Sequence, residues 1–410
     1  APRISIFFPS KFMYEPLNKK HQKCDVGGNN MRTVPFNVPF LTGSENKYIQ
    51  EVFDLNEFAG NGTFTKKVQE ILEEFLDAPR VLLTHSCTAA LELAAMLAGF
   101  GPGDDVLVPS FTFVTSASAI LRTGANVIFC EIDSETMLLD IEDVKEKITP
   151  KTKGIVAVDY AGYSMDFNQI KDLCEEYNLI CIEDAAQGLG SSWNGKALAT
   201  NSRFGAISFH QTKNIHSGLG GCLVINNEED IERSEILWER GTDRSAFFKG
   251  LVDKYSWQDI GSSFYPSELQ AAFLYGQLEG IEGNLKRRLE LWNYYEKILT
   301  PLEKLGYFKL LRPPKDCFHN AHMMALIFPT PKSADIVREF LNEKGIQAVI
   351  HYVPLHASPM GEKMGYVPSD LPITLESAAS LIRLPLHLMM TKEDVDYIYS
   401  ILYSHFEKHD

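Results

Sequence analysis

Short apolar segments alternate with amphipathic segments from about Ser44 to Asn226, and this alternation constrains the fold more than any other feature. The amphipathic segments predict helices at 44–58, 64–76, 87–99, 112–122, 140–148 and 166–177. The apolar segments predict strands at 106–109, 126–131, 154–159, 179–183, 204–209 and 221–226, and a further strand runs into a helix within 82–90. Strands that alternate with helices favour a mostly parallel sheet covered by helices, an α/β fold.

The pattern changes after Ser267. A long helical stretch at 267–305 precedes a predicted strand at 322–328, a helix at 332–343, a strand at 346–352 and helices at 374–382 and 392–405. We therefore expect a large domain over 31–266 and, over 267–410, a connecting helix with a smaller C-terminal α+β domain. Residues 1–30 do not match this pattern, and we expect them to be an extra N-terminal segment with Met31 as the natural start.

Bulk composition excludes several classes of protein. The 39 basic and 54 acidic residues give a net charge of −15, which argues against a nucleic-acid or anionic-membrane surface. No apolar run is long enough to span a bilayer. The seven cysteines form no C-x-x-C pair, so we expect reduced thiols, no metal site and a cytoplasmic location.

Lys213 and Asp184 are the candidate catalytic residues, 29 positions apart. Asp184 follows the apolar run 179–182, which predicts a buried strand, and open α/β sheets bind ligands at the carboxyl ends of their strands. A lysine there can form a Schiff base with the aldehyde of pyridoxal 5'-phosphate, and an aspartate can pair with its pyridinium nitrogen. Taken singly, a solvated lysine and a helix-capping aspartate are the more common roles, so the pair carries the hypothesis.

Further polar residues fit the same cofactor. The segment 82–90 places small polar residues at a helix N-terminus, where free N–H groups favour a phosphate, although simple N-capping by Ser86 is the more common role for such a segment on its own. Phe113 is a candidate platform for the cofactor ring or a core aromatic, and Gln187 a candidate partner of the phenolate oxygen or a surface amide. The predicted cofactor-binding set is Lys213, Asp184, Gln187, Ser86, Cys87, Thr88, Phe113 and Ser208.

These residues, in this order and spacing, resemble the DegT/DnrJ/EryC1/StrS sugar-nucleotide aminotransferases, and the resemblance runs from about Val34 to Phe406. It implies the fold type I, aspartate aminotransferase-like architecture and a homodimer with shared active sites. Many relatives complete the partner's site with an asparagine, where this chain has Ser262-Ser263, so Ser263 is the corresponding candidate. A sister branch with histidine at the lysine position performs dehydration, and Lys213 argues against that branch.

A finer likeness within the group rests on segments 86–89, 184–188, 209–214, 241–245, 253–263, 320–323 and 351–356. It implies amino transfer from glutamate to dTDP-4-dehydro-6-deoxy-D-glucose, giving dTDP-4-amino-4,6-dideoxy-D-galactose for cell-surface polysaccharide synthesis. The candidate substrate-binding residues are Arg244, Lys249, His322, His351 and Tyr352. A 3-keto dTDP-sugar, a UDP-4-keto sugar, a pyridoxal phosphate lyase or dehydratase, and a non-catalytic regulator of the same fold remain alternatives.

Overall fold

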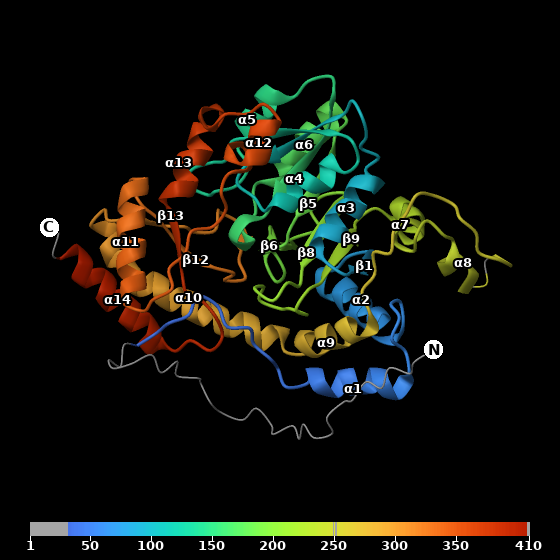
Figure 1. Ribbon diagram of the computed structural model, residues 1–410, viewed down its shortest axis with the longest axis horizontal. Helices are drawn as coiled ribbons and strands as arrows, with labels where there is room; N and C mark the ends of the chain where they lie inside the picture. The colour runs from blue at the N-terminus through green and yellow to red at the C-terminus, as the bar shows by residue number, and fades with distance from the viewer. Residues whose placement is uncertain (1–31, 249, 251, 408–410) are drawn as a thin grey trace, which may run out of the picture. The chain divides into compact units, whose positions relative to one another are not determined.

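The computed structural model describes residues 32–248, 250 and 252–407, and the expected N-terminal segment 1–30 lies outside them. Its main element is a seven-stranded sheet in the order β1-β9-β8-β5-β4-β2-β3 (Figure 1). β9 is antiparallel to both neighbours, and all other adjacent strands are parallel. The bounds are β1 Arg80–Thr84, β2 Asp105–Pro109, β3 Asn126–Cys130, β4 Thr152–Val158, β5 Ile180–Asp184, β8 Phe204–Ser208 and β9 Gly221–Ile225.

Helices cover both faces of this sheet, which explains why its strands are apolar along nearly their whole length. Val106 and Val108 of β2 pack on one face with α3 and α4, whereas Leu107 packs on the other face with α5 and α6. A further cluster joins α1, α2 and α9 to β1 and β9. The helices are α1 Glu45–Leu55, α2 Thr63–Leu76, α3 Cys87–Leu97, α4 Val114–Leu121, α5 Ile141–Lys147, α6 Phe167–Tyr177, α7 Ile231–Trp238, α8 Arg244–Phe248 and α9 Glu268–Leu278.

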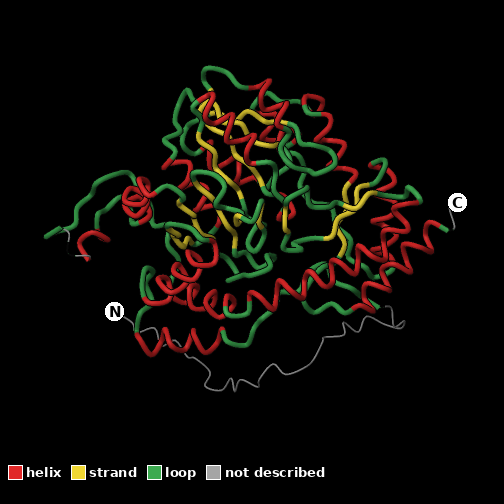
Figure 2. The backbone as a smooth tube through the Cα atoms, turned by 180° about the vertical axis from the view of Figure 1, so that it is seen from behind, coloured by secondary structure: helices red, strands yellow, loops and turns green. Residues whose placement is uncertain are grey.

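A smaller sheet, β10-β12-β13, follows in the C-terminal third and packs with α10, α11 and α14. Figures 1 and 2 show α9 and α10 running in succession from the large sheet towards this small one. The elements are α10 Ile281–Lys304, β10 Lys309–Leu310, β12 Met324–Ile327, α11 Pro331–Glu343, α12 Pro359–Lys363, α13 Pro372–Ser380, β13 Leu381–Leu384 and α14 Lys392–Phe406. The short strands β6 Ser192–Trp193, β7 Lys196–Ala197 and β11 Cys317–Phe318 form a third sheet. Within the described ranges, no helix is long and apolar enough to cross a membrane.

Two C-terminal predictions are wrong. The helix expected over 267–305 is two helices, since α9 ends at Leu278 and α10 begins at Ile281. The strand expected at 346–352 is absent: Val349 forms only an isolated bridge with Arg383, and the Gln347 backbone N–H donates to the Val34 carbonyl instead. The strand beside β12 is β13, which begins at Leu381, so the helix expected over 374–382 ends earlier, at Ser380. The division into domains at 266/267 remains a proposal.

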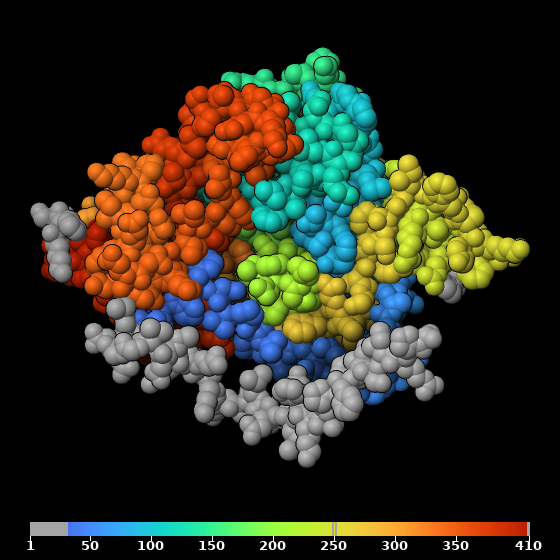
Figure 3. Space-filling view, viewed as in Figure 1, coloured from blue at the N-terminus to red at the C-terminus, as the bar shows by residue number. Residues whose placement is uncertain are grey.

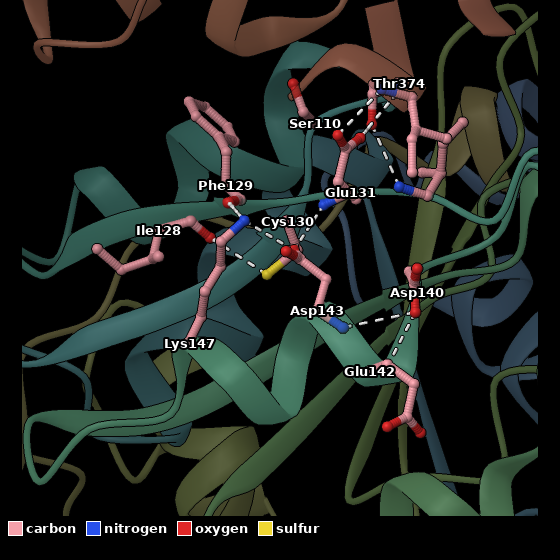
Figure 4. A network of polar contacts seen from close by, with 12 residues as sticks. Ser110, Ile128, Phe129, Cys130, Glu131, Asp140, Glu142, Asp143, Lys147 and Thr374 are labelled. Carbon is pink, nitrogen blue, oxygen red and sulfur yellow. Dashed lines mark hydrogen bonds and ion pairs between the residues drawn. The ribbon is translucent and has the colours of Figure 1, made fainter. Parts of the chain in front are cut away.

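Glu131 ties α13 to the edge of the large sheet (Figure 4). Its carboxylate accepts hydrogen bonds from the backbone N–H groups of Ile373 (3.1 Å) and Thr374 (2.7 Å) and from the Thr374 hydroxyl. The N-cap of α13 is Leu371, and its apolar side chain cannot accept hydrogen bonds. Glu131 therefore caps this helix from 242 positions away in sequence, and its negative charge lies at the positive end of the helix dipole.

Replacing Glu131 with alanine should lower the free energy of unfolding by at least ~2 kcal/mol, because buried donors lose a charged acceptor. The matched control is Glu135→Ala. Glu135 forms a 3.1 Å ion pair with Lys309 between largely exposed side chains, and such pairs contribute about 0–1 kcal/mol. Urea unfolding followed by circular dichroism measures both variants. Equal midpoints for the two would show that Glu131 is not the cap of α13.

Candidate active site

A cavity of about 520 Å³ lies at the carboxyl ends of β4, β5 and β8, beside the N-terminus of α3. This is the edge at which open α/β sheets bind their ligands. Most of the predicted site residues lie together in this cavity. The cavity is lined by, among others, Ser86, Cys87, Thr88, Phe113, Asp184, Gln187, Ser208, Lys213, His322, His351 and Tyr352.

Lys213 follows β8 in a turn that is closed by a 2.8 Å hydrogen bond from its backbone N–H to the His210 carbonyl. Among the described residues, its side-chain amine has no hydrogen-bond or ion-pair partner. Burial lowers the pKa of this amine below its usual value, and the positive charge of Arg383 lowers it further, against the opposing effects of Cys87 and Asp184. Lys213 is therefore an amine that loses its proton more readily than a solvated lysine, as a nucleophile or base requires.

Asp184 is the last residue of β5, and its carboxylate is held from two sides. The Ser116 hydroxyl donates to Oδ2 at 2.6 Å, and the Ala186 backbone N–H donates to Oδ1 at 3.2 Å. Burial raises the pKa of Asp184, while the Ser116 hydrogen bond opposes that change. A cation beside this carboxylate would stabilise its charged form, so the site suits a protonated ring nitrogen.

The N-terminus of α3 opens on the same cavity. Ser86 is the N-cap, and its hydroxyl accepts a 3.1 Å hydrogen bond from the Ala89 backbone N–H, so the capping role weighed from the sequence is present. Thr88 lines the cavity in the first turn, and Ser208 reaches it from the end of β8. Helix N–H groups and two hydroxyls therefore surround one place, an arrangement that favours a phosphate.

Phe113 and Gln187, the two residues predicted to contact the cofactor ring, differ in whether other residues of the protein already occupy them. Phe113 is 53% exposed although it lines the cavity, so its face is open to a planar ligand. Gln187 is already bonded at both ends of its amide. Its Oε1 accepts from the Ala161 backbone N–H at 2.7 Å, and its Nε2 donates to the Tyr352 hydroxyl at 3.1 Å.

The two candidate substrate histidines also have protein partners. His322 Nδ1 lies 3.2 Å from the Asn214 side-chain oxygen, and His351 Nδ1 lies 2.8 Å from the Tyr160 hydroxyl. The His351 ring stacks on Tyr352 with centroids 3.6 Å apart. Burial lowers the pKa of both histidines well below the usual value, so both are neutral hydrogen-bonding groups at neutral pH.

Three predicted residues are not among those that line this cavity. Arg244 lies in α8 and lines a separate hollow with Arg80, Glu235 and Glu239. Ser263 is exposed and pairs with Glu239 through an isolated bridge. Lys249 lies outside the described residues.

Sequence reasoning missed several residues that line the cavity, namely Phe36, Asp159, Arg288 and Arg383. Arg383 had a detectable signal, because it is a lone charge within the apolar run 381–386. Asp159 directly follows β4, just as Asp184 ends β5. A search for polar residues at the carboxyl ends of predicted strands would therefore have found Asp159 as well. Phe36 offered no such signal, because its place in the site depends on long-range packing.

The residues present fit pyridoxal phosphate. A half-buried amine without a hydrogen-bond partner among the described residues, a fixed carboxylate, an open aromatic face and a helix N-terminus with hydroxyls line one cavity of suitable size. Burying a protonated amine without a counter-ion costs free energy. A Schiff base between the amine and an aldehyde carries no ammonium charge when it is neutral, so it avoids that cost.

Comparison with known proteins agrees with this chemistry. The model of the DegT/DnrJ/EryC1/StrS aminotransferase family matches residues 39–403. GDP-perosamine synthase of Escherichia coli O157:H7 is 31% identical over 373 residues, 90% of this chain and 97% of that protein. The dTDP-4-dehydro-2,3,6-trideoxy-D-glucose 4-aminotransferase of Saccharopolyspora spinosa is 30% identical over 366 residues, 87% of this chain and 92% of that protein.

A solved structure shows the same fold at similar identity. DesV of S. venezuelae, crystallised with a ketimine intermediate, is 26% identical, covers 90% of this chain and 97% of its own, and superposes with a TM-score of 0.81. The predicted fold class and cofactor are confirmed. This chain belongs to the DegT/DnrJ/EryC1/StrS aminotransferase family and is a pyridoxal phosphate-dependent aminotransferase.

Proposed function

We propose that this enzyme transfers the amino group of glutamate to a 4-keto-6-deoxy sugar nucleotide, dTDP-4-dehydro-6-deoxy-D-glucose, for cell-surface polysaccharide synthesis in the cytoplasm. The product would be dTDP-4-amino-4,6-dideoxy-D-galactose. The observation that carries the proposal is the joint presence of Lys213 and Asp184 in one cavity. A dehydratase of the histidine branch would lack Lys213, and a non-catalytic regulator would need neither Lys213 nor Asp184.

Each residue has a distinct task in this reaction. Pyridoxal phosphate, when bound, supplies an electrophilic carbon that holds the amino group between the two half-reactions, and a ring that delocalises electrons. Lys213 anchors the cofactor and, once displaced by glutamate, takes the proton from the donor's α-carbon. Asp184 keeps the ring nitrogen protonated, and the N-terminus of α3 binds the phosphate. Phe113 packs against one face of the ring.

The name of one relative supports the choice of acceptor, because that relative is a 4-aminotransferase of a dTDP-linked dehydro-deoxy sugar. Another relative of similar identity is a GDP-perosamine synthase, so the nucleotide is the part of the proposal that needs a direct test. The test is to incubate the protein with glutamate and, separately, dTDP-, UDP- and GDP-linked 4-keto or 3-keto sugars, and to determine product structure by NMR. Amination only of a UDP- or GDP-linked sugar, or at C3, would overturn the proposed substrate. A protein that releases no 2-oxoglutarate from glutamate would not be this aminotransferase.

We also propose a homodimer. The segment 242–262 carries exposed apolar side chains, among them Trp257 at 78% and Ile260 at 73% exposure, which a second copy would cover. Figure 3 shows this segment, in yellow, at the edge of the described surface. Ser263 and Arg244 lie in or beside it, so in a dimer both are candidates to contact the partner's site. Light scattering after size-exclusion chromatography measures the assembly.

Arg244→Ala should then raise the KM for the sugar nucleotide about tenfold or more, because a charge-assisted contact to phosphate is lost, and should leave the glutamate half-reaction unchanged. Arg122→Ala is the control: the Arg122 side chain is 70% exposed and pairs with Glu92 at 3.0 Å, outside this segment. Equal damage to both half-reactions would indicate a structural role for Arg244. An unchanged KM would exclude it from the diphosphate site.

A further inference from the structure

Asp159 is an acidic group of the cavity to which the reaction above assigns no task. It directly follows β4 and lines the cavity, yet only 1% of its surface is exposed. Its backbone N–H donates to the Asp184 carbonyl at 3.1 Å, which holds the two residues side by side at the ends of β4 and β5. No donor among the described residues serves either side-chain oxygen of Asp159. A buried carboxylate without a donor or a cation is costly, so its charge needs an explanation.

The direct neighbour of the Asp159 carboxyl group is the carboxyl group of Glu183 in β5. Glu183 is fully buried, and it accepts hydrogen bonds from the backbone N–H groups of Ala199 (2.6 Å) and Asn201 (2.8 Å) and from the Asn201 side-chain amide (3.3 Å). These donors stabilise a negative charge on Glu183, whereas Asp159 has none. Two buried carboxyl groups in contact cannot both ionise at low cost, so a proton between them belongs on Asp159.

The other titratable groups around Asp159 do not favour its charge. Asp184 acts on it from the end of β5 and is itself acidic. The thiols of Cys181 in β5 and Cys317 in β11 are neutral, because burial raises the pKa of both. No lysine, arginine or histidine in the described ranges forms an ion pair with Asp159 or Glu183. Burial therefore raises the pKa of Asp159, and the negative charge of Glu183 raises it further.

Asp159 and Asp184 are the acidic residues in the described lining of the cavity, and their hydrogen bonds separate them. The Asp184 carboxylate accepts from the Ser116 hydroxyl and the Ala186 backbone N–H, and the charge of Lys213 favours its ionised form. Asp159 has no comparable donor or cation. Where one of the two carries a negative charge, that charge therefore belongs on Asp184.

We propose that Asp159 and Glu183 share one proton, held on Asp159, and that this pair leaves Asp184 as the single negative charge facing the cavity. Asp159 is then a positioning residue, because it acts through the charge of Asp184. An ionised Asp159 would place a second negative charge beside Asp184 and would repel the phosphates and carboxylates that enter the same cavity. The inference goes beyond the proposed function, and its tests use neither glutamate nor a sugar nucleotide, so a failure of the proposed substrates would leave it untouched.

The first test is the pH dependence of the thermal midpoint in the wild-type holoenzyme and in Asp159→Asn. An aspartate in the unfolded chain loses its proton near about pH 4. Above that pH only the folded wild type keeps the shared proton, so its stability falls as the pH rises through the folded pKa of the pair. The amide in Asp159→Asn donates to Glu183 and does not titrate, so the midpoint of the variant minus that of the wild type should increase by about 3 °C or more between about pH 5 and about pH 8. Asp172→Asn, at an exposed position of α6, is the control and should follow the wild type at every pH.

Infrared spectroscopy of the holoenzyme, isotope-labelled at the side-chain carboxyl carbon of aspartate, detects the proton directly. The wild type and Asp172→Asn should show the carbonyl band of a protonated aspartate at about pH 7, and Asp159→Asn should lack it. A midpoint difference that stays constant or shrinks as the pH rises would overturn the proposal, as would a wild-type spectrum without that band. If Asp159→Asn does not fold, Asp159→Ser takes its place in both measurements, because its hydroxyl can also donate to Glu183.

Discussion

Lys213→Ala should abolish both half-reactions, with rates reduced by ~10³-fold or more, while the protein still binds pyridoxal phosphate non-covalently. The physical reason is that one amine has two tasks in the proposed reaction, anchoring the cofactor and moving the proton. Phosphate and ring contacts from α3, Asp184 and Phe113 remain in the variant. Rapid-mixing absorbance with glutamate, and then with the keto sugar nucleotide, measures the two rates separately.

Covalent labelling tests the same residue without turnover. Borohydride should attach the cofactor irreversibly to the wild-type protein, and peptide mapping should find the label on Lys213. Lys171→Ala is the matched control, since the Lys171 side chain is 71% exposed and forms only a 3.7 Å pair with Glu175. That variant should label and turn over as the wild type does. A label on another lysine would remove Lys213 from the reaction.

The large sheet and the meeting of Lys213 and Asp184 in one cavity could be predicted from sequence because their signals are local. Each strand is a short apolar run, and parallel strands present their carboxyl ends at one edge, so Asp184 and the residues after β8 had to lie near each other. The proposed phosphate position rests in the same way on small polar residues between β1 and α3. These inferences need only the direction of the strands and the order of the strands and helices along the chain.

The parts that could not be predicted depend on pairing between distant segments. Arg383 enters the cavity from β13, which pairs with β12, whereas the segment 346–352 forms only isolated bridges, one with Val34 and one with Arg383. Glu131 caps a helix that begins more than 200 residues later. In both cases the partner of a polar group is set by tertiary packing, which hydrophobic periodicity does not report.

Asp184→Asn should slow both half-reactions by ~100-fold or more, equivalent to about 2.7 kcal/mol of barrier, and leave the unfolding midpoint nearly unchanged. The amide keeps the shape of the carboxylate: its oxygen can accept from the Ala186 backbone N–H while its NH2 group donates to the Ser116 hydroxyl, so packing is preserved. It carries no charge, so the ring nitrogen loses its protonated form and with it much of the stabilisation of the carbanion that forms at the α-carbon.

Two further variants separate this charge effect from a change in geometry. Ser116→Ala removes one hydrogen bond to Asp184 but keeps its charge, so it should slow both half-reactions far less than Asp184→Asn does. Asp172→Asn, at an exposed position of α6, should have no effect. If Asp184→Asn retains activity within about threefold, worth only ~0.7 kcal/mol of barrier, Asp184 is not the partner of the ring nitrogen. Comparable losses in Ser116→Ala and Asp184→Asn would instead show that the position of this carboxylate matters more than its charge.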